Sequence, residues 1–106
     1  MKVLQLNDMV KGWFVGDFDP VALRSTEAEV AYKEYKQGDK ESAHLHKIAT
    51  EVTVIAYGRV EMNGKTYNKG SIIIMEPSEA TDFLALEDCA TVVVKLPSVK
   101  GDKYPI

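Results

Sequence analysis

The sequence predicts an all-β domain, either a double-sheet jelly roll or a small barrel. Short segments rich in β-branched and aromatic residues recur along most of the 106 residues. Turn residues separate these segments at intervals of roughly eight to twelve positions, and only one stretch could form a helix. Chains with this pattern form sandwiches or barrels, and closing the sheets removes exposed strand edges. One domain, residues 1–106, accounts for the whole chain.

The first part of the chain is irregular before strand signals begin. Residues 7–18 contain glycines on either side of Trp13 and Phe14. Residues 19–29 are compatible with a single helical turn. Strict alternation of side chains then starts at 29–36, as expected for a strand with two different faces.

The second half of the chain carries the clearest strand signals. Residues 51–58 are rich in β-branched side chains and end at a glycine, which favours a strand. The dipeptide Asn63-Gly64 within 59–70 is a strong hairpin signal. The remaining predictions are strands at 71–75 (ending before Pro77), 82–86 and 90–97, and an extended tail at 97–106.

Composition excludes several classes of partner. The formal net charge of -3 and the isoelectric point near 5.3 give no electrostatic basis for binding nucleic acid. No apolar run is long enough to cross a membrane, and the first residues lack the apolar core of a signal peptide. The single cysteine, Cys89, cannot form an intramolecular disulfide and suits a reducing compartment. We expect a cytoplasmic protein with a small-molecule ligand.

Both histidines of the chain lie two residues apart. His44 and His46 would project from the same face of a strand. Glu51 opens the next predicted strand and could bring a carboxylate to the same point. Two imidazoles and a carboxylate suit Zn, Fe, Mn, Ni or Cu and leave positions open for water or substrate. The alternative is that both imidazoles face solvent on an edge strand.

Glycines at both ends extend this motif to G-x5-H-x-H-x4-E-x6-G over residues 38–58. The pattern resembles the first signature motif of the cupin superfamily at all five fixed positions. Most of the chain also resembles a group of small single-domain cupins. The resemblance implies a double-stranded β-helix, the cupin type of jelly roll. It also implies that His44, His46 and Glu51 are metal ligands that point into the barrel.

The second cupin motif, G-x5-P-x-G-x2-H-x3-N, is degraded here. Gly70 and Pro77 are present with one additional residue between them, and counting on from Pro77 places Asp82 at the position of the third histidine. Either Asp82 is a fourth ligand, or the remaining three residues hold metal weakly or not at all. A second carboxylate would lower the Lewis acidity of the ion, admit harder ions such as Mn, and disfavour oxygen activation.

Two further residues are candidate ligand contacts. Tyr57 shares a face with Glu51 if their strand is regular. Lys95 interrupts a run of valines, and an inward-facing ammonium there could bind a carboxylate or phosphate. A cysteine nucleophile is disfavoured, because Cys89 follows two carboxylates that oppose its ionisation and no histidine is left to act as its base.

The sequence therefore predicts a small metal-binding domain that acts on or senses a small polar molecule, such as a sugar derivative or an organic acid. With Glu51 and Asp82 as proton-transfer groups, isomerase or lyase chemistry fits best. The alternatives are a non-catalytic ligand-binding or regulatory domain and, disfavoured by Asp82, a metal-dependent dioxygenase. Whether the protein is an enzyme, and which of Mn, Fe, Zn or Ni it holds, stay open. We expect a homodimer that pairs through sheet edges, as small cupins commonly do.

Overall fold

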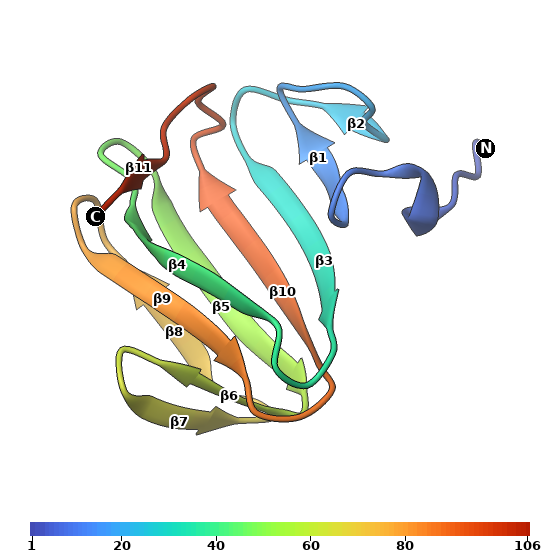
Figure 1. The fold of residues 1–106 in the computed structure, drawn as a ribbon. Helices are drawn as coiled ribbons and strands as arrows, with labels where there is room; N and C mark the ends of the chain where they lie inside the picture. The colour runs from blue at the N-terminus through green and yellow to red at the C-terminus, as the bar shows by residue number, and fades with distance from the viewer.

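Two facing β-sheets make up the computed structural model, which describes residues 1–106 (Figure 1). The first sheet has the strand order β2-β1-β3-β10-β5-β8, and the second has the order β11-β4-β9-β6-β7. All pairings are antiparallel except that of β1 with β2. The strands are β1 (Trp13–Gly16), β2 (Leu23–Arg24), β3 (Glu29–Tyr35), β4 (Lys40–Leu45), β5 (Thr50–Tyr57), β6 (Arg59–Met62), β7 (Lys65–Asn68), β8 (Ile72–Met75), β9 (Ala80–Ala85), β10 (Cys89–Leu96) and β11 (Tyr104–Pro105).

The chain crosses repeatedly from one sheet to the other. Strands β3, β5, β8 and β10 belong to the first sheet, and the intervening β4, β6, β9 and β11 belong to the second. Consecutive strands therefore wind around a common interior, which is the topology of a double-stranded β-helix. The predicted all-β jelly roll is confirmed. The structure contains no helix that could span a membrane.

Most predicted strands lie within one or two residues of the observed ones. The Asn63-Gly64 turn joins β6 to β7, and both residues have positive φ (51° and 79°), as a tight hairpin turn requires. The prediction of a helical turn at 19–29 is wrong, because this stretch contains the short parallel strand β2. The only helical element is a 3-10 turn, Leu6–Asp8.

Apolar and polar side chains occupy opposite ends of the interior. Near the β6–β7 hairpin, six buried side chains form the hydrophobic core. Each large apolar side chain buried there contributes about 1.5–3 kcal/mol to folding. At the other end, the inward-facing positions of the same strands carry charged residues and histidines. The hydrophobic core therefore stabilises one end of the barrel, and a polar cleft occupies the other end. The core residues are Ile55, Val60, Met62, Phe83, Ala85 and Cys89.

Candidate metal and ligand site

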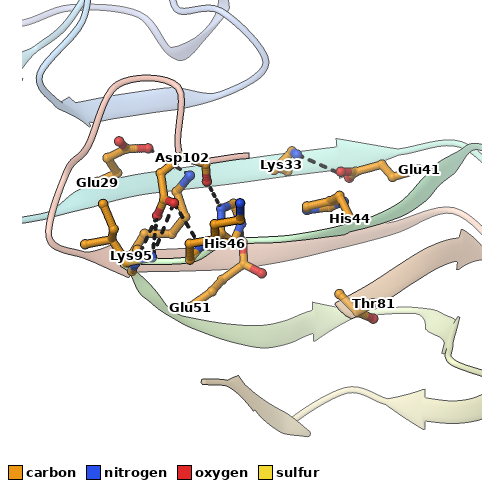
Figure 2. Close-up of polar contacts among 12 residues, drawn as sticks. Glu29, Lys33, Glu41, His44, His46, Glu51, Thr81, Lys95 and Asp102 are labelled. Carbon is orange, nitrogen blue, oxygen red and sulfur yellow. Dashed lines mark hydrogen bonds and ion pairs between the residues drawn. The ribbon is translucent and has the colours of Figure 1, made fainter. Parts of the chain in front are cut away.

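His44 and His46 lie side by side at the polar end of the interior (Figure 2). His44 is on β4, and His46 follows the last residue of that strand. Their ring centroids are 5.3 Å apart and their planes are nearly perpendicular, at 80°. Both residues line the same cleft. The structure therefore brings the two imidazoles together inside the barrel and not outside it.

A β-bulge in β4 determines which side chains reach this interior. The register of β4 against β9 pairs Glu41 with Phe83 and His44 with Thr81, so three residues of β4 span two of β9. A bulge of this kind changes the alternation of side chains along the strand. Glu41 and His44 consequently both face inward, although they are an odd number of residues apart.

The Nδ1 atoms of both histidines contact backbone carbonyls. His44 Nδ1 lies 3.1 Å from the carbonyl oxygen of Ser42, and His46 Nδ1 lies against the carbonyl oxygen of Asp102. A carbonyl oxygen can only accept, so in each neutral ring the proton is on Nδ1 and the lone pair is on Nε2. This is how metal-ligating histidines are usually oriented by the residues behind them.

The Nε2 atom of His46 is buried and has no hydrogen-bond partner in the protein. Unpaired buried polar atoms are uncommon and call for a specific explanation. The carboxylate of Glu51 lies close to His46 Nε2, with Oε1 4.0 Å from this nitrogen. That separation is too long for a hydrogen bond, whereas two ligands that each lie about 2.1 Å from one ion are separated by roughly 3–4 Å.

The donor set therefore fits a divalent transition metal, with His44, His46 and Glu51 as the residues that would hold it. Their side chains are not already gathered around one point, since the chain has no group of three His, Cys, Asp or Glu residues in a metal-binding arrangement. Rotation of the His44 ring and the Glu51 carboxylate toward His46 Nε2 would complete the set.

Asp102, in the C-terminal tail, fixes the position of His46. Besides its carbonyl contact with the imidazole, its buried carboxylate accepts hydrogen bonds from the backbone N–H groups of Lys47, Ile48 and Ala49 at 2.9 to 3.3 Å. Burial opposes ionisation of this carboxyl group, but the three N–H donors and the nearby His46 ring hold its pKa below the usual value. The tail thus binds both the histidine and the turn that follows it.

The structure corrects the predicted position of Asp82. This residue is exposed, its Oδ1 accepts a hydrogen bond of 2.7 Å from the Asn63 backbone N–H, and the Asn63 side chain accepts one from the backbone N–H of Asp82. The preceding residue, Thr81, is buried and is paired with His44. A shift of one residue moves a side chain to the other face of a strand. Asp82 therefore braces the β6–β7 turn and is not brought to the histidines.

The position of Thr81 leads to a test of the register. Thr81→His should place a third imidazole beside His44 and raise the affinity for Mn or Zn by at least about tenfold. Asp82→His is the matched control, because it adds the same side chain one residue away on the exposed face and should leave the affinity unchanged. Isothermal titration calorimetry of both variants measures the difference. A gain in Asp82→His alone would show that the inward face is assigned wrongly.

Tyr57 was predicted to be a ligand contact, but it does not line the cleft. The register of β5 against β10 pairs Thr91 with Ile55 but Ala90 with Tyr57, so Ala56 is an additional residue that interrupts the alternation. Tyr57 is exposed (41%) and points to the outer face. The pKa of its phenol is raised, first by partial desolvation and then by neighbouring groups that include Tyr32 and Glu34.

Lys95 faces inward and forms an ion pair inside the cleft. Its Nζ lies 3.2 Å from Glu29 Oε1, and the other Glu29 oxygen accepts a hydrogen bond of 2.8 Å from the Ser98 hydroxyl. The register places Glu29, Lys95 and Glu51 at adjacent positions across β3, β10 and β5. Lys95 therefore faces inward, as the ligand-contact prediction requires, and it lies on the strand between those that carry Glu29 and Glu51.

A second cation and carboxylate pair lies near His44. Lys33 Nζ is 3.2 Å from Glu41 Oε2, and the Tyr35 hydroxyl donates a hydrogen bond to the same oxygen. Burial opposes ionisation of Glu41, but the Lys33 ammonium and the Tyr35 hydroxyl hold its pKa below the usual value. Burial, with the adjacent carboxylate of Glu41, raises the pKa of Tyr35. At neutral pH Glu41 is therefore a carboxylate and Tyr35 is a neutral phenol.

Trp13 joins the two ion pairs into one surface. The Nζ atoms of Lys33 and Lys95 lie 5.8 Å and 5.2 Å from the centroid of its ring, within the range of a cation–π interaction. These residues, the histidines and Glu51 line a cleft of about 1220 Å³, which is large enough for a small organic ligand. No sequence pattern indicates Lys33, Glu41 or Asp102, because their roles depend on partners that are brought near only by the fold.

Comparison with known proteins identifies the fold. The sequence matches no protein-family model and no curated protein. Among solved structures, a protein with a double-stranded β-helix domain from Klebsiella pneumoniae has a TM-score of 0.71 and 18% identity, covering 94% of this chain and 88% of its own. A sugar phosphate isomerase of the cupin superfamily from Silicibacter pomeroyi has a TM-score of 0.63 and 15% identity, covering 68% and 52%.

Oxalate decarboxylase from Bacillus subtilis, which has Mn(II) centres, is also similar. Its TM-score is 0.64 at 16% identity, and the similarity covers 77% of this chain but 25% of that enzyme. At these identities the similarity concerns the fold. The chain therefore has the double-stranded β-helix fold of the cupins, a fold that carries several different activities.

Proposed function

We propose that this protein is a metal-dependent cupin-fold domain that binds a small organic acid or an acidic sugar derivative. The main support is the Nε2 atom of His46, which is buried, has no partner in the protein and faces the carboxylate of Glu51. His44 is oriented by its own Nδ1 contact and lines the same cleft. Such a donor set suits Mn, Fe, Zn or Ni. A bound ion would polarise a carbonyl or carboxylate oxygen of the ligand.

The charge inside the cleft favours a ligand with a single negative charge. Three carboxylates and two ammonium groups face the histidines, so the protein alone has one net negative charge there. A divalent ion would change the sign of this charge, which leaves one positive charge to balance. Trp13 offers the apolar surface against which the carbon skeleton of a ligand could pack. The charged groups are Glu29, Glu41, Glu51, Lys33 and Lys95.

If the protein is an enzyme, isomerase or lyase chemistry is the proposal that its own residues support best. The support is positional: Glu41 and the Tyr35 hydroxyl that contacts it both line the cleft, where a carboxylate could accept a proton and a phenol could donate one. These residues take the proton-transfer role that the sequence assigned to Asp82. Lys33 pairs with Glu41 and keeps its carboxylate in the charged form between transfers, at the cost of its basicity.

One observation favours a second candidate, a metal-dependent dioxygenase. The sequence disfavoured oxygen chemistry because Asp82 would add a second carboxylate, but Asp82 lies on the exposed face. Two histidines and one carboxylate is the ligand set of non-haem Fe(II) oxygenases. Oxygen consumption by the Fe(II)-loaded protein with a panel of small acids separates the two candidates, because isomerase and lyase reactions consume none.

Lys95 provides a test of the proposed ligand class. Lys95→Met should weaken binding of galacturonate or oxalate to the Mn-loaded protein by at least about tenfold, because it removes the inward cation. Affinity for Mn itself should change by less than about threefold, since Lys95 is not one of the proposed ligands. Calorimetry with Mn first and the acid second measures both quantities. Galactose, the neutral counterpart of galacturonate, should bind weakly to either protein.

Two controls make this test specific. Lys69→Met removes an exposed lysine outside the cleft and should change neither affinity. The double variant Glu29→Gln and Lys95→Met removes the ammonium without leaving a buried carboxylate unpaired, so it should fold normally and still lose acid binding. Equal binding of galactose and galacturonate by the unaltered protein would contradict the proposed ligand class, while the metal assignment would stand.

A further inference from the structure

The cleft continues well beyond the histidines. Its floor runs along the first sheet from Glu51 on β5, across β10 and β3, to Trp13 on β1. Three strand spacings of about 4.8 Å make this distance roughly 14 Å. The cleft volume of about 1220 Å³ also exceeds the roughly 300–1,000 Å³ of sites that enclose drug-sized ligands. A small acid bound at the histidines would therefore leave much of the cleft unfilled.

Residues 6–12, which we call the N-terminal segment, form the wall at the β1 end of the cleft. This segment lies beyond β1, on the side of β3 away from β10 (Figure 1). Six of its residues line the cleft, and Lys11 is the only charged one among them. Three of the six are apolar, and one of these, Val10, is 57% exposed. The six are Leu6, Asn7, Met9, Val10, Lys11 and Gly12.

A tight turn holds this segment against β3. The Trp13 N–H donates a hydrogen bond of 3.0 Å to the Val10 carbonyl. The two residues between them, Lys11 and Gly12, both have positive φ (53° and 82°). The Gly12 carbonyl accepts a hydrogen bond of 3.1 Å from the Tyr32 N–H, and a Cβ atom on Gly12 would lie 1.9 Å from the Tyr32 carbonyl oxygen. Because only glycine permits this approach, the turn fixes where the apolar residues of the segment lie.

The lining of the cleft thus changes from charged to mainly apolar along its length. The part formed by β3, β4, β5 and β10 holds the ion pairs and the histidines. At the β1 end, Trp13 and Phe18 add aromatic surface to that of the N-terminal segment, and the exposed Asp19 next to Phe18 is paired with Arg24. Apolar and aromatic surface takes up the skeleton of a ligand, while a few polar groups fix its orientation.

We propose that the ligand is a carboxylic acid with an apolar chain or ring beyond its acid group, and that the N-terminal segment binds this apolar part. This ligand class rests on the proposed function and narrows it, because the carboxylate would bind near the metal and Lys95. The apolar part would extend along Trp13 toward Met9 and Val10. An acidic sugar has hydroxyl groups along its whole skeleton, and these would lose their water without gaining partners against such side chains.

A series of straight-chain acids tests the proposal. In calorimetry of the Mn-loaded chain, affinity should rise about twofold to fourfold for each methylene from butyrate to octanoate, because each one moves from water onto apolar surface. Octanoate should bind at least about tenfold more tightly than galacturonate, whose skeleton is polar.

The fluorescence of Trp13 provides a second measurement. Trp13 is the only tryptophan of the chain, so the emission reports on this part of the cleft alone. Bound octanoate should shift the emission to shorter wavelength and shield the ring from acrylamide, because its chain would exclude water there. Bound acetate should do neither.

Two substitutions test the role of the N-terminal segment. Met9→Gln keeps the length of the side chain but makes it polar, and it should weaken octanoate binding at least about fivefold without changing butyrate or Mn binding. Gly12→Ala should act in the same way, because the added Cβ would displace the segment from Tyr32. Gly70→Ala is its matched control, since Gly70 also has positive φ (90°), but a Cβ there meets no atom within 4 Å and the residue lies outside the cleft. Circular dichroism shows whether each variant is folded.

The outcomes separate this proposal from the proposed function. Equal affinities for butyrate and octanoate in a chain that binds Mn would overturn the apolar ligand class alone, as would full octanoate affinity in Met9→Gln. Tighter binding of digalacturonate than of octanoate would assign the N-terminal segment to a second sugar ring and overturn it as well. A chain that binds neither Mn nor any acid would overturn both proposals.

Discussion

Replacing both histidines by alanine is expected to reduce the affinity of the protein for Mn or Zn more than a hundredfold. His44 and His46 would supply two of the three proposed ligands, and even residues that only orient a metal ligand are worth about 10- to 100-fold in affinity. The fold should persist, because a chain of about this size can bury enough surface to fold without a metal. Elemental analysis of protein purified without a metal-affinity tag, followed by competition with a chelator, measures the loss.

Asp82→Asn is the matched control for this experiment. It alters a carboxylate that the sequence had placed at the metal and that the structure places at the β6–β7 turn. Metal affinity should be unchanged in this variant. If the double variant His44→Ala and His46→Ala still binds the metal, the two histidines are not its ligands.

Replacing Asp102 by alanine is expected to destabilise the protein by about 2–4 kcal/mol and to weaken metal binding about tenfold. The buried carboxylate accepts hydrogen bonds from three backbone N–H groups, which would all lose their partner. The backbone carbonyl of the same residue contacts the His46 ring. If the tail moved, the imidazole would lose the contact that orients it as a metal ligand. Chemical denaturation gives the free energy of unfolding, and calorimetry gives the metal affinity.

Two variants separate this role from a general effect of the tail. Asp102→Asn keeps one acceptor oxygen and should recover part of both losses. Lys103→Ala changes the adjacent residue, whose side chain makes no comparable set of contacts, and should be nearly neutral. If Asp102→Ala lowered stability but left metal affinity intact, the proposed positioning of His46 would be wrong.

Much of the fold followed from local patterns in the sequence. Alternation at 29–36 and the β-branched run at 51–58 were sufficient to place β3 and β5, because strand signals there are not interrupted by turn residues. The Asn63-Gly64 turn was equally clear, since few residue pairs adopt positive φ twice in succession. The short parallel strand β2 was missed because its two residues are held by pairing with β1 and carry no pattern of their own.

The candidate site was only partly predictable. His44, His46 and Glu51 could be grouped because the spacing of two residues and a following strand are local features. The assignments of Asp82 and Tyr57 failed for a common reason, which is that the face of a strand depends on register and bulges that spacing does not reveal. Asp102 could not be found at all, because it is 56 residues from His46 in the sequence.

The correction at Asp82 also changes the chemistry that the site can support. With Thr81 in the inward position, the proposed metal has one carboxylate ligand instead of two. The ion would then keep more of its positive charge, which strengthens its effect on a bound carbonyl or carboxylate group. The remaining inward carboxylates, Glu29 and Glu41, are each paired with a lysine, so they shape the ligand pocket without being free to neutralise the ion.

Anomalous X-ray diffraction from crystals of the Zn-loaded protein, recorded at the Zn absorption edge, tests the central assignment most directly. We predict one strong peak about 2.1 Å from the Nε2 atoms of both His44 and His46 and at a similar distance from a carboxylate oxygen of Glu51. A peak elsewhere on the chain, with both imidazoles left uncoordinated, would contradict the account.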